Sequence, residues 1–349
     1  MTVPVVVTKP RRAGRRTNLA LLVALPVAFA TGWLAFGTGT LWPARVIIAI
    51  HALAGIVIVA LVPWKQLIIR RGLRRRGSLT VKLAAALLGV LVLTALASGF
   101  VHSWAGVYTY FGLTDMQVHV GSAILAAPLF LLHVLTRRQH VRTTDLSRRN
   151  LLRSGVLIGA GAVTYASLQG LAIVAGLPGR LRRATGSYEQ GTDDPAAMPY
   201  VVWLFDSVPS IDPASYALTV RARGATHQVG YDALAAGTDE VRAIIDCTGG
   251  WYAAQTWRGV RLDHMLPTPA DGEIIVVTSA TGYQRRFPAA EASSLWLATA
   301  VAGAPLDVGH GSPVRLVAPG RRGFWWVKWV VTVELTRGEP WLQSPFPLQ

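Results

Sequence analysis

Cys247 is positioned in the sequence to present a single thiolate to a ligand. It follows the run Ala243-Ile244-Ile245-Asp246 and precedes Thr248-Gly249-Gly250, a pattern that predicts a strand ending in a glycine turn. It is the only cysteine of the chain, which excludes an intramolecular disulfide. The alternative is that Cys247 is a small buried apolar side chain without a chemical role.

A second polar stretch lies downstream and reads Gly309-His310-Gly311-Ser312-Pro313-Val314-Arg315, with Val327-Lys328 further on. The guanidinium of Arg315 suits forked contacts to an anion, and Lys328 offers a point charge. The alternative for these side chains is a solvated basic face. The neighbouring tryptophans are interpreted as packing residues of the core or its rim: Trp325, Trp326 and Trp329.

Together the two stretches resemble the molybdenum-cofactor domain of the sulfite oxidase family. In that family, the protein thiolate of the metal comes from a strand-end cysteine that is followed by a glycine-containing turn and a W-x-G-V-x-L segment, here Trp257–Leu262. A soft thiolate suits a metal that is already bound by the dithiolene sulfurs of a pterin. The resemblance covers roughly residues 196–335. It implies a molybdopterin-dependent oxidoreductase in which Cys247 is the catalytic metal ligand and the pterin is held by His310, Arg315 and Lys328.

Two positions depart from the sulfite-oxidising members of that family. Those members carry an arginine in an R-N-H segment near the start of the domain, where this chain reads Val202-Trp203-Leu204-Phe205-Asp206. They also carry a tyrosine before the H-G motif, where this chain has Thr299. The sequence therefore predicts a retained cofactor site without the sulfite site, and it leaves the substrate open.

The composition indicates a membrane protein. The 349 residues leave room for about two domains. With 52% hydrophobic residues, 15% charged residues and a mean hydropathy of +0.39, the chain is too apolar for a wholly soluble protein. The net charge of +16 could indicate nucleic-acid binding, but the basic residues cluster between apolar runs. Membrane topology explains this clustering better, and we predict no nucleic-acid partner.

Five apolar segments approach the length of about 20 residues that a helix needs to cross a bilayer: 18–38, 45–63, 81–101, 116–136 and 155–176. We expect an N-terminal all-α transmembrane bundle of about five spans, followed by a C-terminal α+β molybdopterin domain of the sulfite oxidase type. The expected organisation is a basic cytoplasmic tail (1–17), a four-helix cytochrome b-like membrane module (18–136), a cytoplasmic loop (137–153), a fifth transmembrane anchor (154–177), a linker (178–198) and an extracytoplasmic molybdopterin-binding domain (199–349).

The orientation follows from the basic residues of the connections. The N-terminal tail and the loops 64–80 and 137–153 are rich in arginine, whereas the connections 39–44 and 102–115 contain no Lys or Arg. The positive-inside rule then places the C-terminal domain outside the cytoplasmic membrane of a bacterium. Three arginines just after the fifth span weigh against this orientation but are outnumbered: Arg180, Arg182 and Arg183.

The start of the fifth span contains a paired arginine motif. Ser147-Arg148-Arg149-Asn150-Leu151-Leu152 precedes an apolar run and resembles a twin-arginine export signal placed inside the chain. A domain that receives its cofactor in the cytoplasm would have to cross the membrane already folded, which favours this interpretation. The alternative is an ordinary arginine pair on the cytoplasmic side.

The C-terminal part shows short β-like runs separated by turns, with a helix expected at 289–295, and this pattern predicts an α+β domain rich in strands. No internal repeat is found in the chain. The expected strands are Tyr200–Leu204, Ala217–Val220, Arg242–Asp246, Gly272–Thr278, Pro313–Val317 and Trp326–Leu335.

Four histidines lie in or at the ends of the spans, namely His51, His102, His119 and His133. Ionisable side chains inside a membrane are usually functional, and the alternative is a neutral imidazole bonded to a neighbouring helix. His51 and His119 lie about 9 Å and about 5 Å from the outer end of their spans, whereas His133 lies about 21 Å from His119, toward the cytoplasm. The four-span part is similar to membrane cytochrome b modules found with molybdenum oxidoreductases. This implies one b-type haem with His51 and His119 as axial ligands, and His133 or His102 as substitutes.

Two functions are compatible with the sequence. In the first, a membrane-anchored molybdenum oxidoreductase exchanges electrons with the quinone pool or another membrane carrier through the haem, and transfers an oxygen atom to or from a small substrate. The membrane electron module favours reduction of a sulfoxide-type substrate, as in the related periplasmic methionine sulfoxide reductase with its separate haem-bearing membrane subunit. In the second, the domain is non-catalytic and keeps a structural cofactor or none. Other enzyme classes are disfavoured because the sequence shows none of their motifs: no paired carboxylates, no Ser/His/Asp order and no phosphate-binding loop.

Overall fold

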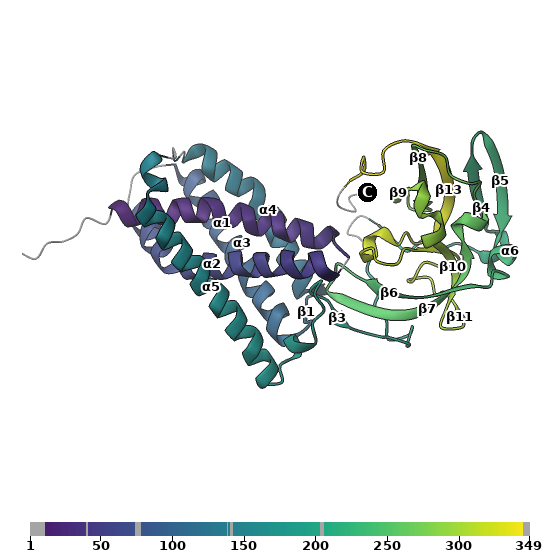
Figure 1. The fold of residues 1–349 in the computed structure, drawn as a ribbon, viewed down its shortest axis with the longest axis horizontal. Helices are drawn as coiled ribbons and strands as arrows, with labels where there is room; N and C mark the ends of the chain where they lie inside the picture. The colour runs from purple at the N-terminus through teal and green to yellow at the C-terminus, as the bar shows by residue number, and fades with distance from the viewer. Residues whose placement is uncertain are drawn as a thin grey trace, which may run out of the picture. The chain divides into compact units, whose positions relative to one another are not determined.

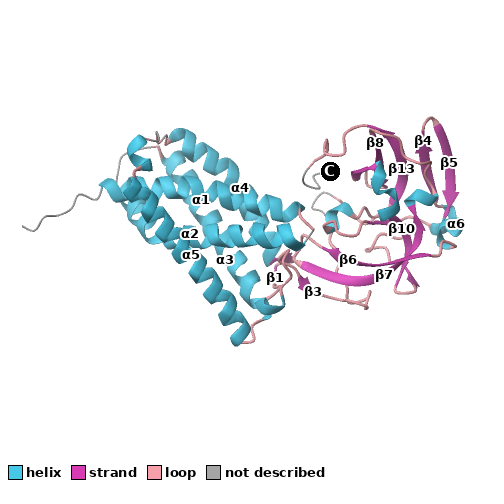
Figure 2. Ribbon diagram, viewed as in Figure 1, coloured by secondary structure: helices cyan, strands magenta, loops and turns pink. Residues whose placement is uncertain are grey.

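The computed structural model describes residues 11–39, 41–73, 78–137, 139, 142–202 and 206–344. The chain forms two compact units, with the main boundary between Gly186 and Ser187. The first unit is helical and the second is built on two sheets (Figure 1, Figure 2).

The helical unit contains α1 (Arg11–Gly37), α2 (Leu41–Leu73), α3 (Leu79–Ala105), α4 (Asp115–Thr136) and α5 (Arg148–Val174). Each of them contains a segment long and apolar enough to cross a membrane. At most 22% of any of these apolar segments is buried within the protein, so most of their residues are not covered by other parts of it. Five such helices are compatible with a membrane-anchored protein, and they lie where the sequence predicts them.

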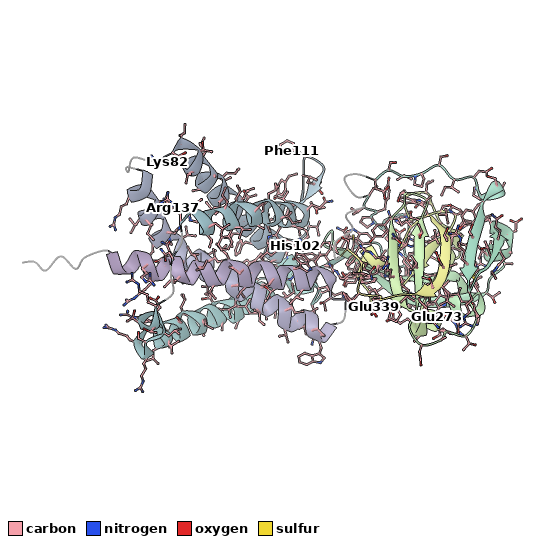
Figure 3. All side chains as sticks on the ribbon, turned by 90° about the horizontal axis from the view of Figure 1, so that it is seen from above. Lys82, His102, Phe111, Arg137, Glu273 and Glu339 are labelled. Atoms are coloured by element: carbon pink, nitrogen blue, oxygen red, sulfur yellow. The ribbon has the colours of Figure 1, made fainter. Side chains whose placement is uncertain are left out.

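The two ends of the helical unit differ in charge. Figure 3 shows Lys82 and Arg137 at one end and Phe111 at the opposite end. Phe111 belongs to the turn between β1 (Thr109–Tyr110) and β2 (Leu113–Thr114), which joins α3 to α4 and contains no Lys or Arg. Thr114 then starts α4 with a capping box, in which its side chain and that of Gln117 each bond the other residue's backbone N–H.

The second unit contains a six-stranded and a five-stranded sheet. The first has the order β11-β10-β7-β3, with β12 also paired to β10 and β6 also paired to β7. Its strands are β3 (Tyr188–Glu189), β6 (Asp239–Asp246), β7 (Trp251–Arg261), β10 (Trp296–Val301), β11 (Ala304–Pro305) and β12 (Arg315–Val317). The second sheet has the order β5-β4-β13-β8-β9, formed by β4 (Ala217–Ala222), β5 (Ala225–Gly230), β8 (Glu273–Ser279), β9 (Gln284–Pro288) and β13 (Val330–Arg337). Short helices complete the unit: α6 (Tyr231–Ala235) and single 3₁₀ turns between strands.

The core of this unit lies along β7 and β10. Alternate residues of β7 are buried, as expected for a strand with one face in the core. Gly259 faces β10 so closely that a Cβ atom there would lie 1.9 Å from the carbonyl oxygen of Leu297. This position therefore admits only glycine.

The strand predictions succeed for β4, β6 and β8, whereas three other predicted strands and the predicted helix differ from the structure. In the run Trp326–Leu335 the strand begins only at Val330. The buried indoles of Trp326 and Trp329 donate hydrogen bonds to the carbonyls of Arg321 and Val308, and these bonds hold the preceding segment in a non-extended conformation. The segment 289–295 is a 3₁₀ turn (Ala289–Ser294) and not an α-helix, and only Arg315–Val317 of the run Pro313–Val317 is a strand. Of the run Tyr200–Leu204, residues 200–202 are not in a strand and the rest lies outside the described residues.

Candidate functional site

One pocket in the second unit brings together four side chains that the sequence predicts to be functional. Cys247, His310, Arg315 and Lys328 all line it, although they are spread over the sequence from the end of β6 to the segment before β13. Further lining residues come from the other sheet and from loops: Tyr200, Asp206, Thr281, Tyr283, Trp326 and Trp329.

Cys247 lies at the end of β6, as predicted. Its backbone N–H donates to the carbonyl of Trp251 (2.8 Å), and its own carbonyl accepts from Gly250 (3.2 Å), which closes a tight turn into β7. Gly250 has a φ of +95°, a conformation that favours glycine. The Sγ atom accepts a hydrogen bond from the N–H of Gly249 (3.3 Å).

The charge state of the Cys247 thiol is set by opposing effects. Burial raises its pKa, while the Gly249 N–H and the positive charges of Arg322 and Lys328 lower it, and burial prevails. Without a metal the group is therefore a neutral thiol, and a bound metal would displace its proton.

A buried ion pair supports the strand end before the cysteine. Arg322 donates to the carboxylate of Asp246 at 2.6 Å, and the two side chains are only 4% and 5% exposed. The hydroxyl of Ser187 donates to the same carboxylate oxygen (2.6 Å), and the second terminal nitrogen of Arg322 donates to the Cys247 carbonyl (3.2 Å). This network fixes the backbone from which Sγ projects.

Arg315 is a fully buried cation with unused hydrogen-bonding capacity. It donates from Nη1 to the His310 carbonyl (3.0 Å) and lies over the rings of Trp257 (4.9 Å) and Trp326 (5.6 Å). Burial lowers its pKa. Its Nε–H has no hydrogen-bond partner among the described residues. Buried N–H donors are rarely left unpaired, so this one indicates an acceptor on a bound molecule.

Lys328 is the second cation of the pocket. Its Nζ donates to the carbonyls of Gly309 (2.8 Å) and Val201 (3.0 Å) and lies 4.9 Å from the centre of the Trp329 ring. Since an ammonium group has three N–H donors, one donor remains beyond these two bonds. Burial, assisted by the charge of Arg315, lowers the pKa of Lys328 to about 8.

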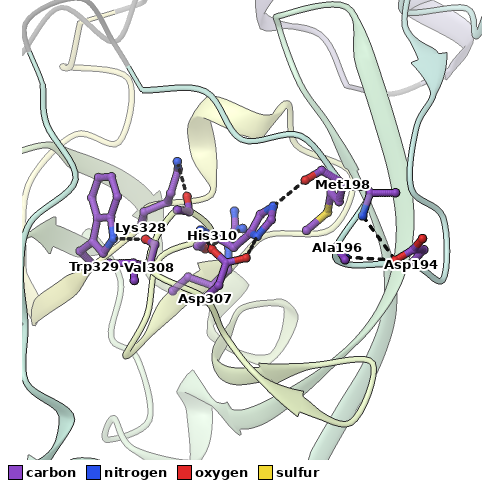
Figure 4. Close-up of polar contacts among 11 residues, drawn as sticks. Asp194, Ala196, Met198, Asp307, Val308, His310, Lys328 and Trp329 are labelled. Atoms are coloured by element: carbon purple, nitrogen blue, oxygen red, sulfur yellow. Dashed lines mark hydrogen bonds and ion pairs between the residues drawn. The ribbon is translucent and has the colours of Figure 1, made fainter.

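His310 lines the same pocket but uses both ring nitrogens within the protein (Figure 4). Nδ1 lies 2.5 Å from the Asp307 carboxylate, and Nε2 lies 2.9 Å from the carbonyl of Met198. We predicted a contact between this ring and the cofactor, and neither nitrogen remains for one. The ring instead holds the loop that contains Gly309 and His310, whose carbonyls orient Lys328 and Arg315.

The sequence did not indicate the residues that β8, β9 and their connection contribute. Tyr283 donates its hydroxyl proton to the Phe324 carbonyl and accepts from Nε of Arg285 (2.6 Å), and burial raises the pKa of Tyr283 to about 12. Thr281 donates to the carboxylate of Asp206 (3.1 Å). No spacing in the sequence relates these residues to Cys247, because they come from the other sheet.

The two positions that depart from the sulfite-oxidising pattern have different outcomes. Thr299 is buried in β10 and is not among the residues that line the pocket, so it does not replace a substrate-binding tyrosine. Residues 203–205 of the other segment lie outside the described residues, and Asp206 at its end lines the pocket.

In the helical unit, His51 and His119 face each other between α2 and α4. Their ring centres are 5.7 Å apart, and their planes are 83° apart. Nδ1 of His51 lies 2.9 Å from the carbonyl of Ala28, and Nδ1 of His119 lies 2.7 Å from that of Ala95. A carbonyl can only accept, so each Nδ1 carries the proton and each Nε2 presents a lone pair.

The other two histidines lie elsewhere. His102, labelled in Figure 3, is buried, with Nδ1 3.2 Å from Asp115 and Nε2 2.7 Å from the carbonyl of Gly186, so both ring nitrogens are used. His133 is half-buried near the charges of Lys65 and Arg137. Among the described residues, neither His102 nor His133 forms a ring pair like that of His51 and His119.

The pocket fits a pterin-bound metal by its donor set. The single thiol can supply one protein ligand, and the unpaired Nε–H of Arg315 and the remaining N–H of Lys328 can bind oxygen or phosphate acceptors. A dithiolene pterin with a terminal phosphate requires these kinds of partner.

The comparison with protein families agrees with this chemistry. The family described as "Oxidoreductase molybdopterin binding domain" matches residues 205–342. No curated protein sequence matches the chain. Among solved structures, the sulfane dehydrogenase SoxCD from Paracoccus pantotrophus is similar, with 22% identity and a TM-score of 0.34, over 37% of this chain and 40% of that chain. This chain thus matches less than half of the length of that protein. Residues 205–342, which include Cys247, Arg315 and Lys328, are an oxidoreductase molybdopterin-binding domain.

Proposed function

We propose that the protein is a membrane-anchored molybdenum oxidoreductase that transfers an oxygen atom to or from a small substrate and exchanges electrons through a membrane-bound b-type haem. The observation that carries the proposal is the partly buried thiol of Cys247 at a strand end, in one pocket with two cations, the buried Arg315 and the partly buried Lys328. When bound, the pterin-coordinated molybdenum supplies the two-electron chemistry.

The residues of the chain have separate roles in this proposal. Cys247 binds the metal through Sγ, and the Asp246–Arg322 pair and the Gly249 N–H orient that atom. Arg315 and Lys328 bind the pterin and its phosphate, and His310 positions both of them through its loop.

The remaining polar groups of the pocket favour an uncharged substrate. Asp206 and Thr281 are joined by a hydrogen bond, and among the described residues that line the pocket Arg315 is the single arginine. If Arg315 and Lys328 are occupied by the pterin, a carboxylate is left on the pocket wall, which repels an oxyanion such as sulfite. This supports reduction of a neutral sulfoxide or N-oxide over oxidation of sulfite.

The first test is a molybdenum assay on the intact detergent-solubilised protein, followed by a screen of sulfoxides, N-oxides and sulfite. We expect stoichiometric molybdenum and turnover of a neutral oxide with a reduced dye as electron donor. If the protein lacks molybdenum when it is produced in a host that makes the cofactor, the alternative of a non-catalytic membrane domain is favoured. Turnover of sulfite alone would contradict the preference for a reductase.

The haem is proposed on the arrangement of His51 and His119. Two imidazoles on opposite sides of one metal ion, each with a metal–nitrogen bond of about 2 Å, have ring centres about 6 Å apart. The observed separation of 5.7 Å is close to this value, and both Nε2 atoms are available as ligands. An axial pair of histidines leaves no open position for oxygen, which suits electron transfer.

Removal of either imidazole should abolish the haem spectrum. We expect His51→Ala and His119→Ala to lose the reducible b-type absorption bands, because one axial ligand disappears. His133→Ala is the matched control and should keep them, since His133 lies outside the pair. The measurement is the dithionite-reduced minus oxidised spectrum of the purified protein, with haem quantified by the pyridine haemochrome. A colourless wild-type protein from haem-replete cells would contradict the haem.

We further propose that the protein spans the cytoplasmic membrane of a bacterium with its C-terminal unit outside. The support is the five apolar helices, the arginine-rich loops on one side, and the Arg148-Arg149 pair at the start of α5, which would act as an internal twin-arginine signal. The quinone pool or another membrane carrier would be the electron partner of the haem.

Cofactor binding should weaken as the pH rises through about 8, the pKa of Lys328. Below this pH Lys328 is positively charged and attracts the pterin phosphate; above it the amine is neutral, so affinity falls by up to about tenfold per pH unit for one linked proton. The measurement is cofactor release from the holoprotein between about pH 7 and about pH 9.5, within which an unperturbed lysine stays charged. In Lys328→Arg, which stays charged, the release should be nearly independent of pH, and an equal slope in both proteins would contradict the assignment.

A further inference from the structure

The two facing histidines of the helical unit are held by the same short sequence pattern. On α1 the chain reads Ala28-Phe29-Ala30-Thr31-Gly32, and on α3 it reads Ala95-Leu96-Ala97-Ser98-Gly99, with an aromatic residue next in both cases. His51 follows the first pattern on α2, 19 residues after its glycine, and His119 follows the second on α4, 20 residues after its glycine.

Two kinds of contact are shared by the two patterns. In each, the carbonyl of the first alanine accepts the Nδ1 proton of the histidine: Ala28 for His51 (2.9 Å) and Ala95 for His119 (2.7 Å). The hydroxyl three residues later bonds back to its own helix, from Thr31 to Val27 (2.6 Å) and from Ser98 to Thr94 (2.7 Å). Thr31 also lies 3.2 Å from Nδ1 of His51, whereas within the described residues Ser98 has no corresponding contact with His119.

The glycine of each pattern leaves room for the imidazole. A Cβ atom at Gly32 would lie 3.1 Å from the ring of His51, and one at Gly99 would lie 2.8 Å from the ring of His119. Side chains at these two positions would therefore displace the rings. Within the described residues, Gly89 on the same α3 helix has nothing within 4 Å of such an atom, so the close contact is a property of the pattern and not of every helix glycine.

The similarity continues after the histidines. A small buried residue lies three positions beyond each, Ala54 and Ser122, and an isoleucine lies five positions beyond each, Ile56 and Ile124. The identical positions are few and are spread over two helices, which is why the sequence alone does not suggest a repeat.

We infer that α1–α2 and α3–α4 are two copies of one helical hairpin, and that each copy positions one imidazole by the same clamp. The shared clamp is the alanine carbonyl and the glycine: Ala28 and Gly32 in the first copy, and Ala95 and Gly99 in the second. In the first copy the hydroxyl of Thr31 adds a further contact to the ring. This inference rests on the proposed haem function and deepens it, because it assigns the positioning residues that set the two rings nearly perpendicular.

The ring orientation has a spectroscopic consequence. In a low-spin ferric haem with two axial imidazoles, perpendicular ring planes bring two iron d orbitals close in energy and give a strongly anisotropic electron paramagnetic resonance signal, whereas parallel planes give an ordinary rhombic one. The angle of 83° predicts the strongly anisotropic signal for the wild-type protein. The clamp residues should control it without binding the haem themselves.

The test compares Gly99→Ala and Gly32→Ala with the control Gly89→Ala in the full-length protein. We expect both clamp variants to shift the resonance away from the wild-type position and to change the haem midpoint potential, because the added methyl group turns the adjacent ring. Gly89→Ala should match the wild type. If the clamp variants bind haem and show the same signal and potential as Gly89→Ala, the clamp is wrong.

Milder variants cover the case in which an added methyl group prevents folding. Thr31→Val removes the hydroxyl near His51 and should shift the signal, whereas Thr31→Ser and Ser98→Thr each introduce the residue of the other copy and should leave it unchanged. An unchanged signal in Thr31→Val, or a shift in either exchange variant, would overturn the equivalence of the copies. A wild-type protein without haem would instead refute the proposed haem function and not the repeat alone.

Discussion

Cys247→Ser is expected to lower turnover by more than about a hundredfold, because loss of residues that only support a metal ligand already costs about 10- to 100-fold. The serine hydroxyl is a harder ligand than the thiolate and is not deprotonated as readily by a pterin-bound metal. The fold should survive, since the turn is held by backbone bonds to Trp251 and Gly250. Turnover with a reduced dye is measured beside molybdenum content and melting temperature.

Thr248→Ser is the matched control for Cys247→Ser, because it changes the next residue of the same turn and keeps its hydroxyl. It should retain most of the wild-type turnover. Wild-type activity in Cys247→Ser would refute the assignment of the thiolate. Equal loss in both variants would indicate a general disturbance of the turn.

Arg322→Met is expected to destabilise the C-terminal unit by about 3–5 kcal/mol, because it leaves the buried carboxylate of Asp246 without its cation. For a unit of this size the loss corresponds to a fall in melting temperature on the order of 10 °C. It should also weaken cofactor retention, since Arg322 bonds the carbonyl of Cys247. Calorimetry and cofactor retention of the purified protein measure the two effects.

The neighbouring arginine offers the control. Arg321 pairs with Glu291 at 2.6 Å, but these side chains are 36% and 34% exposed, so Arg321→Met should cost only about 0–1 kcal/mol. Adding Asp246→Leu to Arg322→Met should restore part of the lost stability, because no uncompensated charge is then buried. Equal destabilisation by Arg321→Met and Arg322→Met would contradict the account of the buried pair.

The sequence predicts the features that depend on local pattern. Five apolar runs give five helices, because the length of an apolar segment determines whether it can cross a bilayer. The β-branched run before Cys247 and the two glycines after it place the thiol at a strand end. The motif around His310 likewise identifies the second side of the pocket.

The features that the sequence does not predict depend on contacts between distant residues. His310 is held by Met198, 112 positions earlier, so its motif could not reveal that its ring nitrogens are already bonded. The eleven residues of β7 form the longest strand of its sheet, although they include Ala, Gln and Gly, which have a low preference for strands. Pairing with β6 and β10 overrides this low preference. Tyr283 reaches the pocket from the other sheet for the same reason.

The network around Asp246 bears on how the C-terminal unit could be excised. Ser187 and β3 belong to this unit, and both lie upstream of residue 199, where we placed the domain start. A soluble fragment that begins at that position lacks Ser187, whose hydroxyl bonds the carboxylate of Asp246. It also lacks β3, so the part of β7 that pairs with β3 would be open to pairing with other chains. A version for biochemistry should therefore begin upstream of Ser187, even though this retains residues that belong to the helical unit.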